Sequence, residues 1–413
     1  MISYSDAKDI IYKTANENLP ETEIASIINC VGRVLAEDLF AKEYVPAFDN
    51  SAMDGFAVKT QWFENGSTFP MRWKVAGLIA AGDDSTKMGS HLDCALEIMT
   101  GAEVPCDYDA VIKIEDVKII KNEHNESAEI LVQETPKKYL NIRRQGEDFQ
   151  IGQLVLKKGN HIKIEHLLAL SALGITEMKV FKVPRIGIIS TGKELVTPEK
   201  KTLAPGEIRN STQLFLDKYL NQKGFPINVS LDHPDNAIEF EQALELLLSG
   251  GVDIVLSTGA VSMGKYDFVM KSLKEMGATI HFHKCAIRPG KPILFASFKY
   301  QGKHKYLFGL PGNPISTVVG LNFFVMPFLN KLLKMDTTVV NKLPLLEDVK
   351  KPEGLRCFYK AKTLFQDELN YVESLPGQAS FMVQPLINAN AWIVLPEEGQ
   401  LLKKGTNVEV YGL

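Results

Sequence analysis

Three turns in the second half of the chain combine glycine with small or polar residues, a composition suited to binding an anion. Two apolar runs end on Ser-Thr-Gly, at Ser190-Thr191-Gly192 and at Ser257-Thr258-Gly259. A third run leads through Pro311-Gly312-Asn313 into a helical pattern. Glycine lets a ligand approach the backbone, and unpaired N–H groups at a helix start attract negative charge. One such turn alone would be an ordinary loop, but the repetition predicts a phosphate-binding edge.

Acidic side chains lie close to these turns. Glu194 follows the first turn, and Asp232 sits just past the next predicted strand. Asp267 follows the second turn by way of Ser262 and Gly264. Carboxylates there would repel a phosphate unless a divalent cation lies between them, which predicts Mg²⁺ bound by Glu194, Asp232 and Asp267. The alternative for Asp267 is that it caps the helix beginning at the next residue.

A cationic loop follows at 284–292. Two prolines and a glycine restrict its backbone, and it carries Lys284, Arg288 and Lys291 before it ends at Pro292. Guanidinium and ammonium groups held in fixed positions suit a tetrahedral oxyanion. The alternative is a solvated surface loop without function, because exposed Lys and Arg are common.

Two polar segments in the first half are also candidates. Residues 49–57 contain two acids, an amide and a hydroxyl between apolar flanks, and residues 141–148 combine two guanidinium groups with two carboxylates. Each could equally be local turn chemistry or an ion-paired surface. Spacing alone does not decide between these readings.

The composition excludes several classes of protein. Of 413 residues, 46 are Lys or Arg and 50 are Asp or Glu, so the net charge of -4 gives no basic field for nucleic acid or anionic lipid. A hydrophobic fraction of 45% and a charged fraction of 23% are typical of a folded globular chain.

Location is predicted from what the sequence lacks. The apolar stretch 318–329 is interrupted and too short to span a membrane, and the N-terminus has no secretory signal. We therefore expect a cytoplasmic protein without a membrane or nucleic-acid partner. The five cysteines form no Cys-x-x-Cys pair and are expected to be reduced, without a metal.

The elements that must position these residues predict a multidomain α/β protein. A helical N-terminal domain is expected at 1–45 and 138–180, with helices over 6–14 (capped by Ser5), 21–35 and 165–173. Short apolar runs separated by turns predict an inserted β-rich lobe at 46–137 and a small C-terminal β-barrel at 336–413, with a β-sandwich as the alternative. Between them, 181–335 should be an α/β domain.

Apolar strands alternate with helices through this α/β domain, which implies a parallel or mixed sheet covered on both faces. Strands are predicted over 185–189, 226–231, 252–256, 279–283, 292–298 and 306–309, and helices over 212–222, 237–248, 268–276 and 314–333. The carboxyl ends of parallel strands share one edge, where ligands bind.

Eight strings in register along the chain resemble the molybdopterin molybdotransferase family, which includes the E domain of gephyrin. They are DNSAMDGFA (49–57), IMTGAEV (98–104), NIRRQGED (141–148), STGKEL (190–195), IRNST (208–212), STGAVSMGKYD (257–267), RPGKP (288–292) and GLPGNPIS (309–316). The order matches from about residue 5 to the C-terminus. Such a set is far more specific than any single glycine turn.

The resemblance implies insertion of molybdenum from molybdate into adenylylated molybdopterin, with Mg²⁺-dependent release of AMP. It also implies a homodimer whose cleft lies between the α/β domain of one subunit and the N-terminal region of the other. The molybdopterin adenylyltransferase that makes the preceding intermediate is a candidate partner. Tungstate remains an alternative to molybdate, because both are tetrahedral dianions of nearly equal size.

Site residues follow from the same resemblance. Positions matching the family's catalytic site are Asp54, Thr100, Asp148, Glu194, Asp232, Asp267 and Lys284. Positions matching its oxyanion site are Arg288, Lys291 and Pro292, joined by Arg356 and Ser380 from the C-terminal domain. Our hypothesis for their roles is that Glu194, Asp232 and Asp267 bind Mg²⁺ and attacking water, while Lys284 steadies charge developing on the phosphate as the adenylate leaves.

Two other functions remain open. An adenylyltransferase would share the α/β domain, but the N-terminal lobe and the barrel argue against it. A scaffold such as the receptor-clustering role of gephyrin would need no catalytic acid, and no long linker or extra domain supports it.

Overall fold

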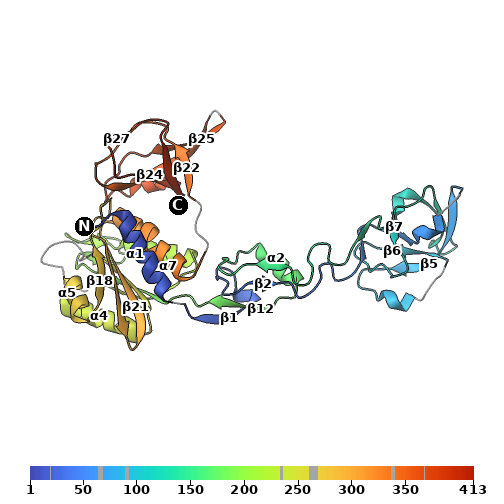
Figure 1. Ribbon diagram of the computed structural model, residues 1–413, viewed down its shortest axis with the longest axis horizontal. Coiled ribbons are helices and arrows are strands. Elements are labelled where there is room, and N and C mark those ends of the chain that lie inside the picture. Colours follow the sequence, from blue (N-terminus) through green and yellow to red (C-terminus); the bar gives the residue numbers. More distant parts are fainter. Residues whose placement is uncertain are drawn as a thin grey trace.

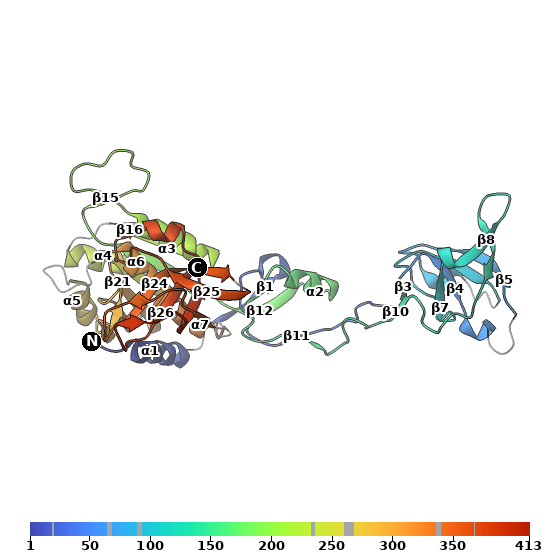
Figure 2. The ribbon, with the colours of Figure 1, turned by 90° about the horizontal axis from the view of Figure 1, so that it is seen from above.

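The protein is elongated in the computed structural model, with its α/β and C-terminal parts at one end and a β-rich lobe at the other (Figure 1). A narrow middle part joins them, and the view from above shows the same separation (Figure 2). The residues described are 1–18, 20–63, 68–88, 93–232, 236–259, 268–335, 340–366 and 368–413.

The α/β domain is built on a six-stranded mixed sheet, which confirms that part of the predicted fold. Its strands are β13 (Ile186–Ser190), β16 (Ile227–Asp232), β17 (Ile254–Thr258), β18 (Thr279–His283), β20 (Leu294–Tyr300) and β21 (Lys303–Leu310). The order is β16-β13-β17-β21-β20-β18. The first four are parallel, and β20 is antiparallel to both of its neighbours. The polar turns after β13, β17 and β21 therefore share one edge.

Helices cover both faces of this sheet. They are α3 (Ser211–Gln222), α4 (Ala237–Ser249), α5 (Phe268–Glu275), α6 (Pro314–Gly320) and α7 (Met326–Leu332). Successive strand residues face opposite sides. Ile188 and Phe308 are buried with residues of α3, α6 and α7, whereas Ile189 and Leu307 are buried with residues of α4 and α5. Two apolar layers thus hold the functional edge in place.

Helices α6 and α7 are joined by a π-helical turn at Leu321–Val325 into one helix over Pro314–Leu332. This confirms the helix predicted over 314–333, which runs through Pro327 although proline has no N–H to donate, and the apolar helix is longer than the stretch 318–329 considered in the sequence. By length and composition it could cross a membrane, but 72% of its most apolar window is buried. Phe324 and Leu329 are fully buried against the sheet, as in a core helix.

The first helix, α1 (Tyr4–Glu17), begins two residues earlier than predicted. Its cap is Ser3, whose Oγ accepts a hydrogen bond from the N–H of Asp6 at 3.1 Å, so the assignment of Ser5 was wrong. Ala7 and Ile11 are fully buried in the cluster that contains α7. By packing, α1 belongs with the α/β domain, although the sequence analysis grouped 1–45 with 138–180.

The prediction of a helix over 21–35 was wrong. The chain forms β1 (Thr22–Ser26), which pairs antiparallel with β12 (Glu177–Phe181), and then a 3₁₀ turn at Ile27–Asn29. Ile24 and Ile28 are 62% and 86% exposed, so their helical spacing marks no buried face. Pairing with a distant strand decides the conformation here.

The rest of the middle part is small. Its elements are β2 (Leu39–Phe40), which pairs with β11 (Leu154–Leu156), and α2 (His166–Ala172), which confirms the helix predicted over 165–173. They enclose an apolar cluster that includes Leu35, Leu170 and Val180.

The inserted lobe is rich in β-structure, as predicted, and its strands form a second six-stranded sheet. Its strands are β4 (Gly55–Val58), β5 (Met71–Ile79), β6 (Ala95–Ile98), β7 (Ala110–Lys113), β8 (Val117–Lys121) and β9 (Ser127–Val132), in the order β7-β4-β6-β5-β9-β8. Short 3₁₀ helices lie at Thr60–Phe63, Ser85–Met88 and Ile114–Asp116. At its base, β3 (Asn50–Ser51) pairs with β10 (Ile142–Arg143), where both connecting segments pass.

The C-terminal part confirms the predicted β-barrel. Its strands are β19 (Ile287–Arg288), β22 (Asn341–Pro344), β24 (Arg356–Gln366), β25 (Leu369–Ser374), β26 (Ala391–Leu395) and β28 (Asn407–Gly412), with β23 (Val349–Lys350) paired to β27 (Leu401–Leu402) and a 3₁₀ helix at Gln384–Ile387. The order is β19-β24-β26-β28-β22, and β25 pairs with β24. A bridge between Leu345 and Val372 connects the end of β22 to β25 and closes the barrel.

Candidate functional site

The polar turns after β13, β17 and β21 meet at the carboxyl edge of the sheet. The N–H and Oγ1 of Thr191 both donate to the carbonyl of Thr258, at 2.9 and 2.8 Å. The N–H of Gly259 donates to the carbonyl of Leu310 at 3.0 Å. Each turn is thus fixed by the next, and the sequence prediction that the three converge is confirmed.

A groove of about 800 Å³ opens at this edge. Predicted residues that line it are Thr191, Gly192, Glu194, Thr258, Gly259, Pro292, Pro311, Gly312 and Asn313. Lining residues that the sequence analysis did not assign are Lys193, Leu195, Ile208, Arg209, Asn210, Ser211, Thr212, Phe268, Pro314 and Phe381. The string at 208–212 was a usable signal for five of these. Nothing in the sequence marked Phe381, which reaches the groove from the barrel.

Two predicted hydroxyls lie behind the groove wall. Ser190 and Ser257 are fully buried. The Oγ of Ser190 donates to Oε1 of Gln213 at 3.2 Å, and Gln213 in turn donates its N–H to Oδ1 of Asn210, the cap of α3. The Oγ of Ser257 has no hydrogen-bond partner among the described residues. These serines support the turns from below.

Glycine is required at two of the turns. Gly259 has φ +82°, and a Cβ there would lie 2.5 Å from Oγ1 of Thr191. Gly192 has φ +133°, and a Cβ there would lie 2.6 Å from a carboxylate oxygen of Glu194. The positive φ disfavours a side chain at both positions, and at Gly259 the backbone oxygen of Thr191, 2.9 Å from the added Cβ, excludes one as well. The carboxylate of Glu194 is therefore folded back against its own turn.

Strand pairing places the acids at neighbouring strand ends. Beside Glu194, strand β14 (Leu195–Val196) pairs with β15 (Ile208–Arg209). Asp232 pairs through its backbone with Ser190 at the end of β16, but its side chain is outside the described part of the chain. Ser262, Gly264 and Asp267 fall in 260–267, also outside the described residues. Within the described ranges, no three or more His, Cys, Asp or Glu side chains lie close enough together to hold a metal ion.

The five cysteines are free, as predicted. Cys285 and Cys357 are buried, and burial raises the pKa of the Cys285 thiol to about 12. A thiol with so high a pKa is a poor nucleophile and a poor metal ligand at neutral pH.

The cationic loop is fixed at its base. The N–H of Cys285 donates to the carbonyl of Lys291, and that of Lys284 to the carbonyl of Ile293, both at 3.0 Å. Arg288 and Lys291 are exposed, and Pro292 lines the groove. Through β19, the loop pairs in parallel with β24, so the α/β domain and the barrel are joined beside the predicted oxyanion residues.

The two barrel residues differ in their surroundings. The carbonyl of Ser380 accepts a hydrogen bond of 3.0 Å from the N–H of Ile315, in the first turn of α6. Arg356 instead places Nη2 3.0 Å and Nε 3.2 Å from the same carboxylate oxygen of Glu397 and lies over the ring of Tyr4. Ser380 therefore lies next to the groove, whereas the guanidinium of Arg356 already has a counterion.

The N-terminal candidates lie away from the groove: Asp54 and Thr100 adjoin β4 and β6 of the lobe, and Asp148 lies in the segment between β10 and β11 that joins the lobe to the middle part (Figure 2). The N–H and Oγ1 of Thr100 donate to one oxygen of Asp54, at 2.7 and 2.9 Å, and these bonds hold the pKa of that carboxyl below its usual value. Asp148 is exposed, and its N–H donates to the carbonyl of Val45. A single chain does not bring these residues to the groove.

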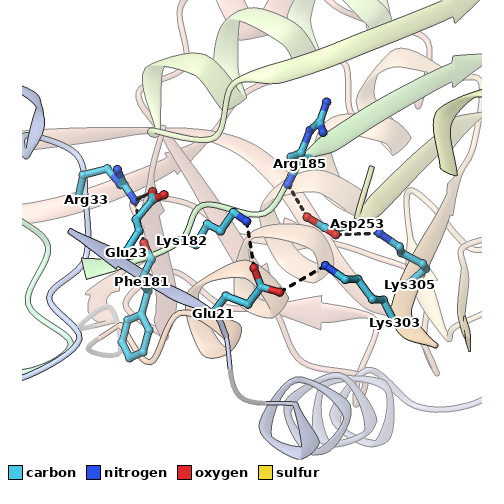
Figure 3. A network of polar contacts seen from close by, with 9 residues as sticks. All are labelled: Glu21, Glu23, Arg33, Phe181, Lys182, Arg185, Asp253, Lys303 and Lys305. Carbon is cyan, nitrogen blue, oxygen red and sulfur yellow. Dashed lines mark hydrogen bonds and ion pairs between the residues drawn. The ribbon is translucent and has the colours of Figure 1, made fainter. Parts of the chain in front are cut away.

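A second cavity of about 500 Å³ lies at the opposite edge of the sheet, near the amino ends of β13, β17 and β21. Figure 3 shows its polar network: Glu21 pairs with Lys182 at 2.9 Å and with Lys303 at 3.5 Å, and Lys305 pairs with Asp253 at 2.9 Å. Glu21 and Lys182 flank β1 and β12, so the network joins the middle part to the α/β domain. No sequence-predicted site residue lies there.

Comparison with known proteins decides the family. Three family models match: "MoeA N-terminal region (domain I and II)" at residues 2–174, "Probable molybdopterin binding domain" at 187–331 and "MoeA C-terminal region (domain IV)" at 342–413. A protein of Synechococcus elongatus named molybdopterin molybdenumtransferase is 36% identical over 415 residues, covering 100% of both chains. The chain belongs to the molybdopterin molybdenumtransferase (MoeA) family. The resemblance found in the sequence is confirmed.

Other relatives agree with this membership. The molybdopterin molybdenumtransferase of Haemophilus influenzae is 34% identical and covers 95% of each chain. The solved structure of a molybdopterin biosynthesis MoeA protein from Pyrococcus horikoshii OT3 has a TM-score of 0.78 and 26% identity, covering 100% of both chains. The whole chain, including the lobe and the barrel, thus has the architecture of this family.

Proposed function

We propose that this chain is a molybdopterin molybdotransferase, which inserts molybdenum from molybdate into adenylylated molybdopterin and releases AMP with the help of Mg²⁺. The observation that carries the proposal is the groove at the sheet edge, where three interlocked turns and the start of α6 present backbone to a ligand. Full-length similarity to curated molybdopterin molybdenumtransferases supports the same activity.

The groove would hold the phosphate and pterin parts of the substrate. Gly259 and Gly312 carry no side chain, so a ligand in the groove can approach their backbone closely. Asn313 precedes α6, is exposed and makes no side-chain cap to it. Its amide is therefore available to a bound substrate.

Mg²⁺ would be held by three acids of the α/β domain, of which Glu194 is the one with a described side chain. Glu194 supplies an exposed carboxylate at the groove, and Asp232 ends the neighbouring strand. With Asp267, they would form the set of hard oxygen ligands that this ion prefers. Bound Mg²⁺ would offset negative charge on the phosphate. Lys284, in the adjoining loop, would steady the charge that develops as the adenylate leaves.

Molybdate would bind beside the groove. Arg288 and Lys291 are exposed cations on a loop closed at its base, and Pro292 reaches the lining. Ser380 lies beside the start of α6, where its carbonyl accepts the N–H of Ile315. Arg356 would either donate its remaining N–H groups to the molybdate or shape the loop 284–292, because its backbone N–H donates to the carbonyl of Ala286. Fixed cationic donors match a tetrahedral dianion.

We further propose a homodimer. Asp54 and Thr100 are exposed in the lobe, Asp148 is exposed in the segment that leads to it, and the groove lies at the opposite end of the molecule, so a second copy could bring the two sets together. We also propose a cytoplasmic location, because an enzyme of this family would work on a soluble biosynthetic substrate. The molybdopterin adenylyltransferase is a candidate partner.

The test is AMP release by the purified protein from adenylylated molybdopterin, with Mg²⁺ and either molybdate or tungstate. We expect release that depends on both the metal and the oxyanion. The variant Asp267→Asn should lose it, and normal turnover by that variant would contradict the assigned role of Asp267. Product formation from molybdopterin and ATP without molybdate would indicate an adenylyltransferase instead. A scaffold would show neither reaction.

A further inference from the structure

A buried lysine in the barrel contacts the loop that reaches the groove. Lys360 lies in β24 and is 0% exposed. Its Nζ donates to the carbonyl of Met382 at 3.0 Å. Among the described residues no carboxylate pairs with it. Lysine is rarely buried without a counterion, so its retention at this position calls for a reason other than stability.

A second side chain fixes the same loop, which spans 375–383. The backbone N–H of Lys360 donates to Oε1 of Gln378 at 2.9 Å, and Nε2 of Gln378 donates back to the carbonyl of Lys360 at 2.9 Å and to that of Leu375 at 2.6 Å. The loop is therefore attached to one point of β24 by two side chains, with Gln378 near its middle and Lys360 holding Met382 near its end.

The part of the loop between these attachments forms a wall of the groove. The carbonyl of Ser380 accepts from the N–H of Ile315 at the start of α6. Phe381 lines the groove and is nevertheless 68% exposed. An exposed aromatic ring costs little to display but gains nothing without a ligand. The attachments of the loop hold this ring beside the glycine turns.

We propose that Lys360 is a positioning residue, which holds the loop 375–383 so that Ser380 and Phe381 form the barrel wall of the substrate groove. This inference rests on the proposed function. Lys360 does not touch the groove itself and acts through the carbonyl of Met382. Gln378 also positions the loop, through its hydrogen bonds to the backbone of Lys360.

Burial supports this reading, since it lowers the pKa of Lys360 to about 8. At neutral pH the group is therefore mostly a charged donor beneath the loop, on the face of β24 opposite Tyr359 and Ala361 of the barrel interior, and its charge is not used by any carboxylate among the described residues. A methionine of similar length would fill the space without the hydrogen bond.

The experiment compares Lys360→Met, Gln378→Leu and the control Lys305→Met in AMP release. Lys305 is also buried, but it pairs with Asp253 at the opposite edge of the sheet. We expect the first two variants to raise KM for adenylylated molybdopterin or molybdate roughly ten-fold with kcat changed less than about two-fold, because misplaced binding groups weaken substrate binding. The control should leave both constants unchanged.

Hydrogen exchange measured by mass spectrometry gives a readout that does not depend on turnover. Lys360→Met and Gln378→Leu should speed exchange in 375–383 and at the N–H of Ile315, whereas Lys305→Met should not. Unchanged exchange would show that Lys360 does not hold the loop, and faster exchange with unchanged KM would show that the loop does not serve the substrate. Either result overturns the inference. Absence of AMP release by the unmodified chain would overturn the proposed function itself.

Discussion

At the scale of single residues, the groove depends on backbone positions that admit no side chain. The carbonyl and hydroxyl oxygens of Thr191 lie where a Cβ on Gly259 would stand. The same contact locks the first Ser-Thr-Gly turn to the second. These glycines therefore do two things at once, since they allow a positive φ and let two strand ends touch.

Replacing Gly259 by alanine tests this contact. Gly259→Ala should lower the free energy of unfolding by about 3 kcal/mol, because it combines the left-handed backbone cost with a clash. The matched control is Gly277→Ala, which has φ +74° and no atom within 4 Å of the added Cβ, and should cost only about 1 kcal/mol. Urea denaturation of both variants measures the difference. Equal losses would show that the clash is relieved by movement of Thr191.

The buried Lys360 makes stability depend on pH. Its pKa is about 8 in the folded chain against 10.5 in the unfolded chain, so between these values the unfolded chain binds more protons and the free energy of unfolding rises with pH. Below pH 8 both states are charged, and burial costs about 3 kcal/mol.

Lys360→Met removes this cost. Allowing for the lost hydrogen bond of about 1 kcal/mol, the variant should be more stable than the unmodified chain by about 2 kcal/mol at pH 7, and the gain should disappear near pH 10.5. Urea denaturation at pH 7 and pH 10.5 measures both values. A variant that is less stable at pH 7 would mean that the Met382 hydrogen bond outweighs the desolvation of the charge.

At the scale of elements, the sequence predicted the α/β domain well because its information is local. Apolar runs, glycine turns and caps such as Asn210 lie within a few residues of the elements that they define. The helix predicted over 21–35 failed because β1 depends on pairing with β12, far along the chain. Phe381 was missed for the same reason, since only the packing of the barrel on α6 brings it to the groove.

The cap of α3 supports the groove as well as its helix. Asn210 accepts from the N–H of Gln213, and its Nδ2 also donates to Oε1 of Gln213, which receives the Ser190 hydroxyl. Asn236 caps α4 in the same way, through the N–H of Glu239, and does not line the groove.

Asn210→Ala and Asn236→Ala should each lower the free energy of unfolding by about 1 kcal/mol, as the loss of an N-cap does. Only Asn210→Ala should also reduce kcat/KM for AMP release, because it loosens the segment 208–212 on the groove wall. Thermal denaturation and the release assay on the same two proteins separate these effects. Equal activity losses in both variants would mean that helix stability alone matters.

At the scale of the whole molecule, the elongated shape separates the proposed N-terminal site residues from the groove (Figure 2). Hydrogen bonds hold Asp54 and Thr100 together in the lobe, yet no ligand-sized groove of the α/β domain adjoins them in one chain. In the sequence, Asp54 and Thr100 match positions of the same family catalytic site as the acids of the α/β domain. A site shared between two copies reconciles the resemblance with the shape.

Mixing two inactive variants tests this sharing. In a homodimer with exchanged contributions, a hybrid of Asp54→Ala and Asp267→Asn subunits has one intact site and one doubly altered site. After subunit exchange half of the dimers are hybrids, so AMP release should recover to about a quarter of the unmodified rate. The control mixture, Asp54→Ala with Thr100→Ala, alters the same contribution in both subunits and should stay inactive. No recovery in the first mixture, once sedimentation has shown that subunits exchange, would place the whole site within one chain.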